Sequence, residues 1–242
     1  MLTVIIRRSD EPKVIQMTES EMVKQLDPIL GAEILLEDTW LAGLRKVRTP
    51  YVCLVEADCT LSGQYFLTNY GLLKKTIAKG KTGVGRGGDR GGGGDTSYAM
   101  LSSCLGIKNF GNRIYNFQLE EVQDINVNKV TGKSWHVMPN RNKLDIRLYT
   151  VQIGFVPGAI IRMSSIKDII DTMDWDQADL IKMSTEVSFY FWDTIRRVVL
   201  NPSTTYVTNN DYEHPPLFQV KVPDKVAHIF QREYIGSVPS NV

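Results

Sequence analysis

The stretch that most constrains this chain is an apolar run of strand length, residues 51–59, that ends in two carboxylates. Its first five residues are apolar, with β-branched and aromatic members, which is typical of a strand buried on both faces inside a parallel sheet. Glu56 and Asp58 lie two positions apart, so an extended backbone places both side chains on one side. Open α/β sheets bind ligands beyond the carboxyl ends of their strands. The pair therefore suits Mg²⁺ or Mn²⁺ held together with phosphate oxygens, and an acidic turn after a core strand is the alternative.

The composition excludes several classes of protein. A chain of 242 residues can bury one full core, and 28 basic against 27 acidic residues favour no polyanionic partner by net charge alone. Three cysteines and three histidines lack the paired spacing of a zinc site or a disulfide framework. Arg7 and Arg8 follow the first apolar residues at once, so we expect no signal peptide, and no apolar run approaches the roughly 20 residues that span a bilayer. These features predict a cytoplasmic protein with no membrane partner.

The first 60 residues alternate between strand and helix patterns. Residues 2–6 and 32–36 are apolar runs of strand length, while residues 18–26 and 39–47 have helical spacing. A strand–helix–strand–helix–strand order implies right-handed crossovers and a parallel sheet. We therefore expect an α/β fold.

Charged residues also follow the two strands that precede the central one. Glu37 and Asp38 come directly after residues 32–36, and Arg7 and Arg8 come directly after residues 2–6. Such arginines could face a phosphate, although surface arginines are the commoner explanation.

The order of these elements, with the sequence TPYVCLVEADC at residues 49–59, resembles the nucleotide-binding half of family-2-like glycosyltransferases with the GT-A fold. The resemblance implies a single domain with a mixed, mostly parallel sheet flanked by helices. It implies that Glu56-Ala57-Asp58 is the Asp-x-Asp element that holds the metal, with Glu37 or Asp38 on the uridine of a UDP-sugar. The family has a longer spacing between these acids, so this chain would be a shortened version.

Residues 79–95 form a glycine-rich segment with four basic residues, Lys79, Lys81, Arg86 and Arg90. The segment lacks the first glycine of a P-loop, and no helix follows its nominal dinucleotide-binding fingerprint. Its two Arg-Gly-Gly units are typical of segments that follow nucleic-acid backbones by charge and stacking. A solvated flexible loop is the alternative.

Two further motifs appear in the second half of the chain. Residues 154–162 resemble the family's glycine loop, which implies that Gly158 approaches the transferred sugar and diphosphate. Glu186 resembles the acid that opens a helix beneath the sugar, with Thr185 as its N-cap, although Val187 stands where the family has a second acid. The resemblance makes Glu186 the catalytic base, with Asp179 as the next candidate. The alternative is an acidic first-turn residue favoured by the helix dipole.

A histidine after the last expected strand completes the metal site in the family. The resemblance places His214 there, and an imidazole beside carboxylates suits Mn²⁺. His228 is the rival, and a structural histidine is the alternative.

These expectations combine into one hypothesis about the whole chain, 1–242. Residues 1–66 would bind nucleotide and metal, residues 79–95 would form a flexible loop, and residues 148–216 would carry the acceptor and catalytic half. The activity implied is an inverting, metal-dependent transfer of a hexosyl or N-acetylhexosaminyl group from a UDP-sugar to a hydroxyl. The resemblance to small phage enzymes implies that the acceptor is a hydroxymethylated base in DNA. A non-catalytic nucleic-acid-binding module is the alternative, and the oligomeric state stays open. Nucleotidyl transfer would need a glycine-rich first loop, which residues 7–12 lack.

Overall fold

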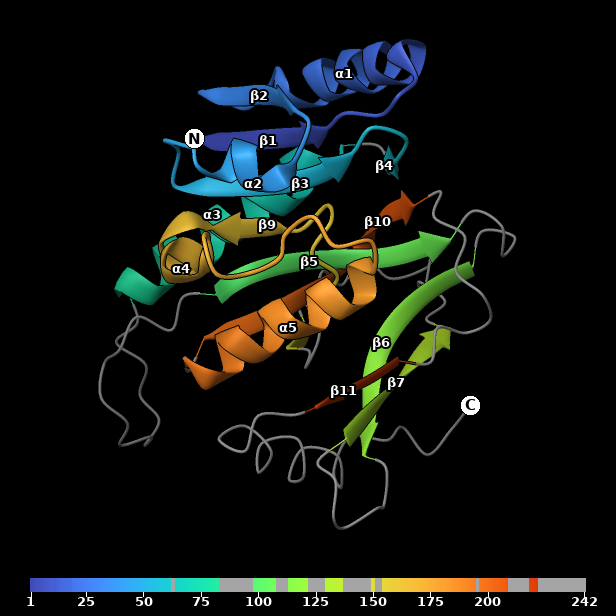
Figure 1. Cartoon of the computed structure of the whole chain (residues 1–242). Coiled ribbons are helices and arrows are strands. Elements are labelled where there is room, and N and C mark those ends of the chain that lie inside the picture. The colour runs from blue at the N-terminus through green and yellow to red at the C-terminus, as the bar shows by residue number, and fades with distance from the viewer. Residues whose placement is uncertain are drawn as a thin grey trace.

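The computed structural model describes residues 1–61, 64–82, 98–107, 113–121, 129–136, 149–150, 154–194, 196–208 and 218–221. Its elements follow one another along the chain as drawn in Figure 1. They are β1 (Leu2–Arg7), α1 (Pro12–Leu26), β2 (Ala32–Glu37), α2 (Trp40–Leu44), β3 (Tyr51–Glu56), β4 (Thr60–Leu61), α3 (Tyr65–Thr82), β5 (Tyr98–Ile107), β6 (Arg113–Glu121), β7 (Lys129–His136), β8 (Tyr149–Thr150), β9 (Ile160–Arg162), α4 (Met163–Ile166), the 3₁₀ helix η2 (Lys167–Ile169), α5 (Leu180–Asp193), β10 (Arg197–Thr208) and β11 (Phe218–Lys221).

One mixed sheet of 11 strands runs through the described residues in the order β11-β7-β6-β5-β9-β3-β1-β2, with β10 beside β5. Strands β2, β1 and β3 are parallel, as the alternation of strand and helix patterns predicts. Strand β9 lies antiparallel between β3 and β5, and β10 is parallel to β5, so β1, β2, β3, β5 and β10 all run in one direction. The expected α/β class with a mixed sheet and flanking helices in a single domain is confirmed.

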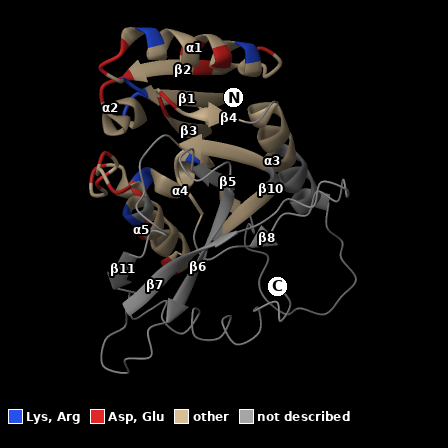
Figure 2. Ribbon diagram, turned by 90° about the vertical axis from the view of Figure 1, so that its right-hand side faces the viewer, with Lys and Arg blue, Asp and Glu red and all other residues tan. Residues whose placement is uncertain are grey.

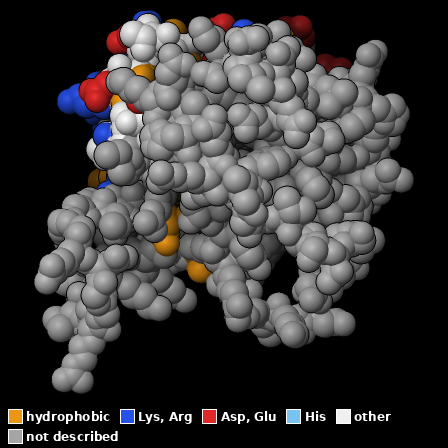
Figure 3. Space-filling view, turned by 90° about the horizontal axis from the view of Figure 1, so that it is seen from below, with side chains coloured by type: hydrophobic (Ala, Val, Ile, Leu, Met, Phe, Trp, Pro, Cys, Tyr) orange, Lys and Arg blue, Asp and Glu red, His pale blue; other side chains and the backbone are white. Residues whose placement is uncertain are grey.

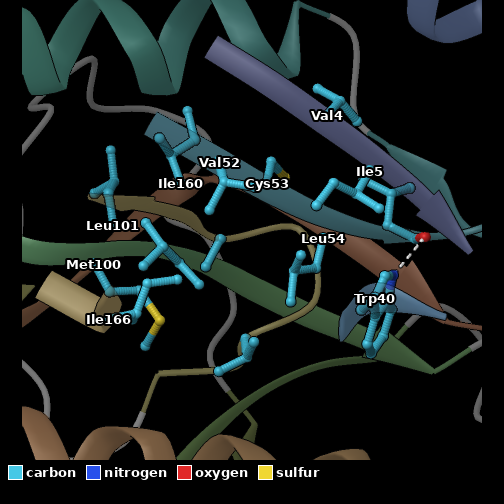
Figure 4. Packing of buried hydrophobic residues seen from close by; sticks show 14 of the residues in the cluster. Val4, Ile5, Trp40, Val52, Cys53, Leu54, Met100, Leu101, Ile160 and Ile166 are labelled. Atoms are coloured by element: carbon cyan, nitrogen blue, oxygen red, sulfur yellow. Dashed lines mark hydrogen bonds between the residues drawn. The ribbon is translucent and has the colours of Figure 1, made fainter. Parts of the chain in front are cut away.

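Helices cover both faces of this sheet. Figure 1 shows α2, α4 and α5 in front of the sheet and α3 behind it, and the rotated view of Figure 2 agrees. Helix α1 packs against α3 and β2, while α2 packs against β1 and β2. The buried side chains of the central strands fill the space between these layers, as the close view of Figure 4 shows around Val52, Leu54 and Ile160. The strands buried on both faces are therefore those with continuous apolar sequence.

Helix α2 approaches the sheet unusually closely. A Cβ atom added at Gly43 would lie 2.5 Å from the side chain of Ile5 on β1, so only glycine permits this contact. The side chain of Thr39 caps the helix by accepting a hydrogen bond from the Ala42 amide at 3.1 Å. The helix expected over residues 39–47 is therefore present in a shortened form.

Helix α1 and strand β10 also differ from their predicted bounds. Helix α1 begins at Pro12, which occupies its first turn, and Thr18 lies inside the helix, where its hydroxyl donates to the Ala57 carbonyl. The sequence predicts two strands, 198–200 and 205–208, joined by a turn at 201–203. The structure has one strand, β10, whose register with β5 shifts between Asn201 and Thr205. The buried amide of Asn69 on α3 hydrogen-bonds across this irregularity, accepting from Asn201 at 2.7 Å and from Thr204 at 3.2 Å.

Candidate active site at the ends of β1, β2 and β3

Three charged residues form a row across the ends of the three parallel strands. Arg7 on β1 is in register with Glu37 on β2 and with Glu56 on β3. Paired residues of neighbouring parallel strands direct their side chains to the same side of the sheet. The charged residues that follow the apolar runs in the sequence therefore form an acid–base–acid row in the sheet.

Glu56 is a buried carboxylate held by the distant strand β10. Its side chain accepts hydrogen bonds from the hydroxyls of Tyr206 at 3.1 Å and Thr208 at 3.0 Å, and an Arg7 nitrogen lies 3.8 Å from its other oxygen. Burial raises the pKa of Glu56 above its ordinary value of 4.5, the negative charge of Asp58 raises it further, and the hydrogen bonds and Arg7 oppose this rise. Glu56 thus anchors β3 to β10 as well as lying at the expected metal position.

The guanidinium of Arg7 lies over an aromatic ring, and its side chain is mostly buried. Its guanidinium carbon is 4.2 Å from the centre of the Trp40 ring, a cation–π contact. The Trp40 indole in turn donates to the Val55 carbonyl on β3 at 3.2 Å, as drawn in Figure 4. The Trp40 ring therefore fixes the position of the Arg7 guanidinium at this edge of the sheet.

The two acids expected beside a uridine form ion pairs. Both oxygens of Glu37 lie 2.7 Å from the Lys46 ammonium, and the mainly exposed Asp38 lies 3.4 Å from Arg8. The Asp38–Arg8 pair is exposed on both sides and contributes little to stability, so Asp38 can exchange its partner for a ligand at small cost, whereas the Glu37 side chain is mostly buried. Around α1 and α2 both signs of charge are interspersed in Figure 2, and basic and acidic side chains also lie together on one side of the face shown in Figure 3.

Asp58 is the exposed member of the strand-end acid pair. It follows the buried Ala57 in a turn closed by the Cys59 amide, which donates to the Glu56 carbonyl at 3.3 Å. Magnesium and manganese sites commonly take one or two protein carboxylates and complete their shell with water and substrate phosphates. Asp58 offers exposed oxygen donors of this type, whereas the buried Glu56 carboxylate already contacts side chains of β10 and β1. Within the described ranges no cluster of three or more His, Cys, Asp or Glu side chains suited to a metal is present, and His214 lies outside those ranges.

Gly158 has a structural reason to be glycine. It has a φ of +78°, and an added Cβ would lie 2.3 Å from the Tyr206 ring and 2.7 Å from the Tyr65 hydroxyl. Its amide donates to the Leu54 carbonyl on β3 at 2.7 Å, and its carbonyl accepts from Tyr65 at 2.7 Å. The residue is thus tightly enclosed beside β3, and its contact with a sugar or diphosphate stays a prediction.

Helix α5 is tied to the glycine segment by two buried serines. The Ser184 hydroxyl accepts a hydrogen bond from the Val156 amide at 3.0 Å, and the Ser188 hydroxyl accepts from the Gly154 amide at 3.2 Å. The segment 154–158 is therefore fixed between β3 and α5.

The expected helix start at Glu186 is wrong. Helix α5 begins at Leu180, where the Asp179 side chain accepts from the Lys182 amide at 3.0 Å, and Glu186 lies in the middle of the helix. Asp179, the alternative base, is therefore the N-cap, and the sequence signal for it was an aspartate directly before the apolar run. Glu186 is half-buried, and its carboxylate accepts a hydrogen bond from the Gln177 amide group at 3.1 Å.

Asp176 is a residue that the sequence reading missed. One of its carboxylate oxygens accepts from the Trp40 amide at 2.7 Å, and the other accepts from the Leu41 amide at 3.2 Å. These partners lie 136 and 135 residues away in the chain, so no local pattern could reveal the contact. The segment 79–95 was expected to be a flexible loop, but its first residues, including Lys79 and Lys81, belong to helix α3, which ends at Thr82. Arg86 and Arg90 lie outside the described residues. No described helix is long and apolar enough to cross a membrane.

Comparison with known proteins gives a likeness in structure only. No protein-family model and no curated protein matches the sequence. A crystal structure of GalNAc-T7 with UDP, GalNAc and Mn²⁺ is similar with a TM-score of 0.51 and 8% sequence identity, over 88% of this chain and 44% of that one. Residues 1–349 of S. aureus TarS give a TM-score of 0.45 at 10% identity, over 86% of this chain and 60% of that one.

This chain therefore spans less than half of the GalNAc-T7 chain that it matches. At such low identity the likeness concerns the arrangement of helices and strands. The chain has the GT-A type of α/β fold.

Proposed function

We propose that this protein is a metal-dependent, inverting glycosyltransferase that moves a hexosyl or N-acetylhexosaminyl group from a UDP-sugar to a hydroxyl acceptor. The observation that carries the proposal is the acidic end of β3, Glu56 and Asp58, beside Arg7 at the carboxyl edge of a GT-A-type sheet. Ligands of open α/β sheets bind at this edge. GalNAc-T7, which shares the fold, has a crystal structure with UDP, GalNAc and Mn²⁺.

The chain's own residues divide between metal, nucleotide and phosphates. Asp58, with Glu56 behind it, would hold the divalent cation, and His214 is the proposed third ligand. Mn²⁺ or Mg²⁺ bound by these residues would supply positive charge to offset the negative charge of the leaving diphosphate. Glu37 or Asp38 would accept hydrogen bonds from the uridine, and Arg7 and Arg8 would offset phosphate charge.

Glu186 is the proposed base. Its carboxylate takes the proton from the acceptor hydroxyl while that oxygen forms a bond to the anomeric carbon. The bond between this carbon and the diphosphate oxygen breaks in the same step, and UDP departs with the bonding electrons. Attack from the face opposite the leaving group inverts the anomeric centre. The position of Asp179 as the N-cap of α5 favours Glu186 over it.

The acceptor that we propose is a hydroxymethylated base in DNA, in a cytoplasmic setting. Its support is the sequence of the segment 79–95, whose Arg-Gly-Gly units suit a nucleic-acid backbone. Contacts to phosphates release counterions, so the affinity for modified duplex should fall steeply with salt. Replacement of Arg86 and Arg90 by alanine should weaken binding and flatten the salt dependence. An unchanged affinity and salt slope would remove DNA contact from this segment.

Titration of the purified protein with UDP, with and without Mn²⁺, tests the central proposal. We expect Mn²⁺-dependent UDP binding and slow hydrolysis of one nucleotide sugar in the absence of acceptor. Binding of UDP with no hydrolysis or transfer from any donor would favour a non-catalytic module with this fold. Absence of binding to UDP and to other nucleoside diphosphates would overturn the proposal.

A further inference from the structure

One short segment contacts both helix α2, which lies beside the acidic strand ends, and the proposed base Glu186. It is the turn 174–179, between η2 and α5, which is distant in sequence from β1, β2 and β3. Asp176 accepts hydrogen bonds from two amides at the start of α2, and its neighbour Gln177 donates to the Glu186 carboxylate on α5. Adjacent residues thus join the helix beside the acidic strand ends to the proposed base.

The contact of Asp176 matters because α2 is only five residues long. So short a helix has no stability of its own and depends on tertiary contacts. Asp176 satisfies the amides of Trp40 and Leu41, and the Thr39 side chain satisfies that of Ala42. Asp176 therefore holds the start of α2, and with it Trp40, in place. The centre of the Trp40 ring lies 4.2 Å from the guanidinium carbon of Arg7.

The contact of Gln177 matters because Glu186 lies in the middle of α5. A glutamate in this position has three rotatable side-chain bonds, and most of its rotamers do not direct the carboxylate toward one target. The Gln177 amide group, 3.1 Å from one carboxylate oxygen, selects the rotamer seen in the structure. Gln177 is in turn held near Asp174 through a hydrogen bond from its side chain to the Asp174 carbonyl at 3.1 Å.

We infer that Asp176 and Gln177 are positioning residues: Asp176 fixes Arg7 through α2 and Trp40, and Gln177 orients the Glu186 carboxylate. The inference rests on the proposed function, in which Arg7 faces the diphosphate and Glu186 is the base. It predicts separate effects for two neighbouring residues, because one acts on ligand binding and the other acts on the chemical step.

The test compares Asp176→Ala, Gln177→Leu and the matched control Asp171→Asn. Asp171 also contacts α2, through an exposed ion pair with Arg45 at 2.8 Å, so its loss removes a charge without releasing the start of the helix. The measurements are hydrogen exchange of the Trp40 and Leu41 amides without ligand, the Kd of UDP with Mn²⁺, and kcat and KM for donor hydrolysis.

In Asp176→Ala we expect faster exchange of both amides and a Kd for UDP raised about tenfold, which corresponds to the loss of a hydrogen bond to a charged group. In Gln177→Leu we expect kcat lowered about tenfold with the Kd of UDP unchanged, since a small misplacement of a reacting group costs at least that much. Asp171→Asn should match the wild type. General destabilisation would not produce this crossed pattern.

Each other outcome is decisive. If the wild type binds UDP but Asp176→Ala leaves amide exchange or the UDP Kd unchanged, the role of Asp176 is overturned. If Gln177→Leu retains full kcat, or raises the Kd of UDP as much as it lowers kcat, the role of Gln177 is overturned. If the wild type binds neither UDP nor another nucleoside diphosphate, the proposed function falls, and the positioning roles fall with it.

Discussion

Tyr206 and Glu56, which are 150 residues apart, are joined by two hydrogen bonds. The Tyr206 hydroxyl donates to a Glu56 carboxylate oxygen at 3.1 Å and accepts from the Glu56 backbone amide at 3.1 Å. Both residues are buried, so neither bond is readily replaced by water. The end of β3, on which the proposed metal site depends, is therefore held by β10.

Replacement of Tyr206 by phenylalanine should lower the free energy of unfolding by about 1–3 kcal/mol, because it leaves a buried carboxylate and amide with fewer partners. Urea denaturation checks this. Tyr190→Phe on α5, where the ring is half-buried against Phe191, is the matched control. Equal stability of the two variants would show that the Tyr206 hydroxyl is dispensable.

The stability of the metal-free protein should depend on pH through Glu56. Burial raises the pKa of Glu56 in the folded state above 4.5, so between 4.5 and this raised value the folded state binds more protons than the unfolded state. Stability then falls as pH rises through that window. In Glu56→Gln this fall should disappear, as measured by urea denaturation at several pH values. The exposed Glu21→Gln should keep it, and an identical pH dependence in all three proteins would contradict the prediction.

Gly158→Ala and Gly71→Ala should have opposite effects. An alanine at 158 would have a positive φ and would clash with Tyr206 and Tyr65, so we expect a loss of at least about 2 kcal/mol. Gly71 lies within α3 and has nothing within 4 Å of an added Cβ, so alanine there should be neutral or stabilising by up to about 1 kcal/mol. Thermal unfolding of both variants checks this. A stable Gly158→Ala protein would refute the close packing at this turn.

Asp58→Ala should abolish Mn²⁺-dependent turnover while the melting temperature stays close to that of the wild type. The side chain is exposed at a strand end, so its loss removes a proposed metal ligand and little packing. Asp27→Ala, at the exposed end of α1, is the control. Full Mn²⁺-dependent activity in Asp58→Ala would show that the metal assignment is wrong.

Glu186→Gln should lose sugar transfer but retain binding of UDP and Mn²⁺. Glutamine has the size of glutamate but cannot accept a proton at neutral pH. Single-turnover kinetics together with calorimetric titration separate the two effects. Weaker donor binding with an unchanged single-turnover rate would assign Glu186 to binding instead.

How much of the site was predictable depended on the range of the contacts involved. The strand-end charges Arg7, Glu37 and Glu56 follow apolar runs, so their places at the ends of strands could be read from local sequence, whereas their alignment in one row comes from the strand register. Helix α5 begins at Leu180, six residues before the predicted start at Glu186, because Asp179 caps it. Asp176 and Gln177 gave no local signal, since their partners are chosen by tertiary packing.

Local sequence patterns were enough to predict the α/β class, the parallel arrangement of β1, β2 and β3, and the charges at the ends of these strands. These depend on hydrophobic periodicity and on turn residues, which act over a few positions. Three features of the site come from the packing of distant segments: the burial of Glu56 by Tyr206 and Thr208, the position of Arg7 over Trp40, and the contact between Gln177 and Glu186. The physical reason is that burial, hydrogen bonding and charge pairing depend on which distant segments share one space, and those segments come together only when the core packs.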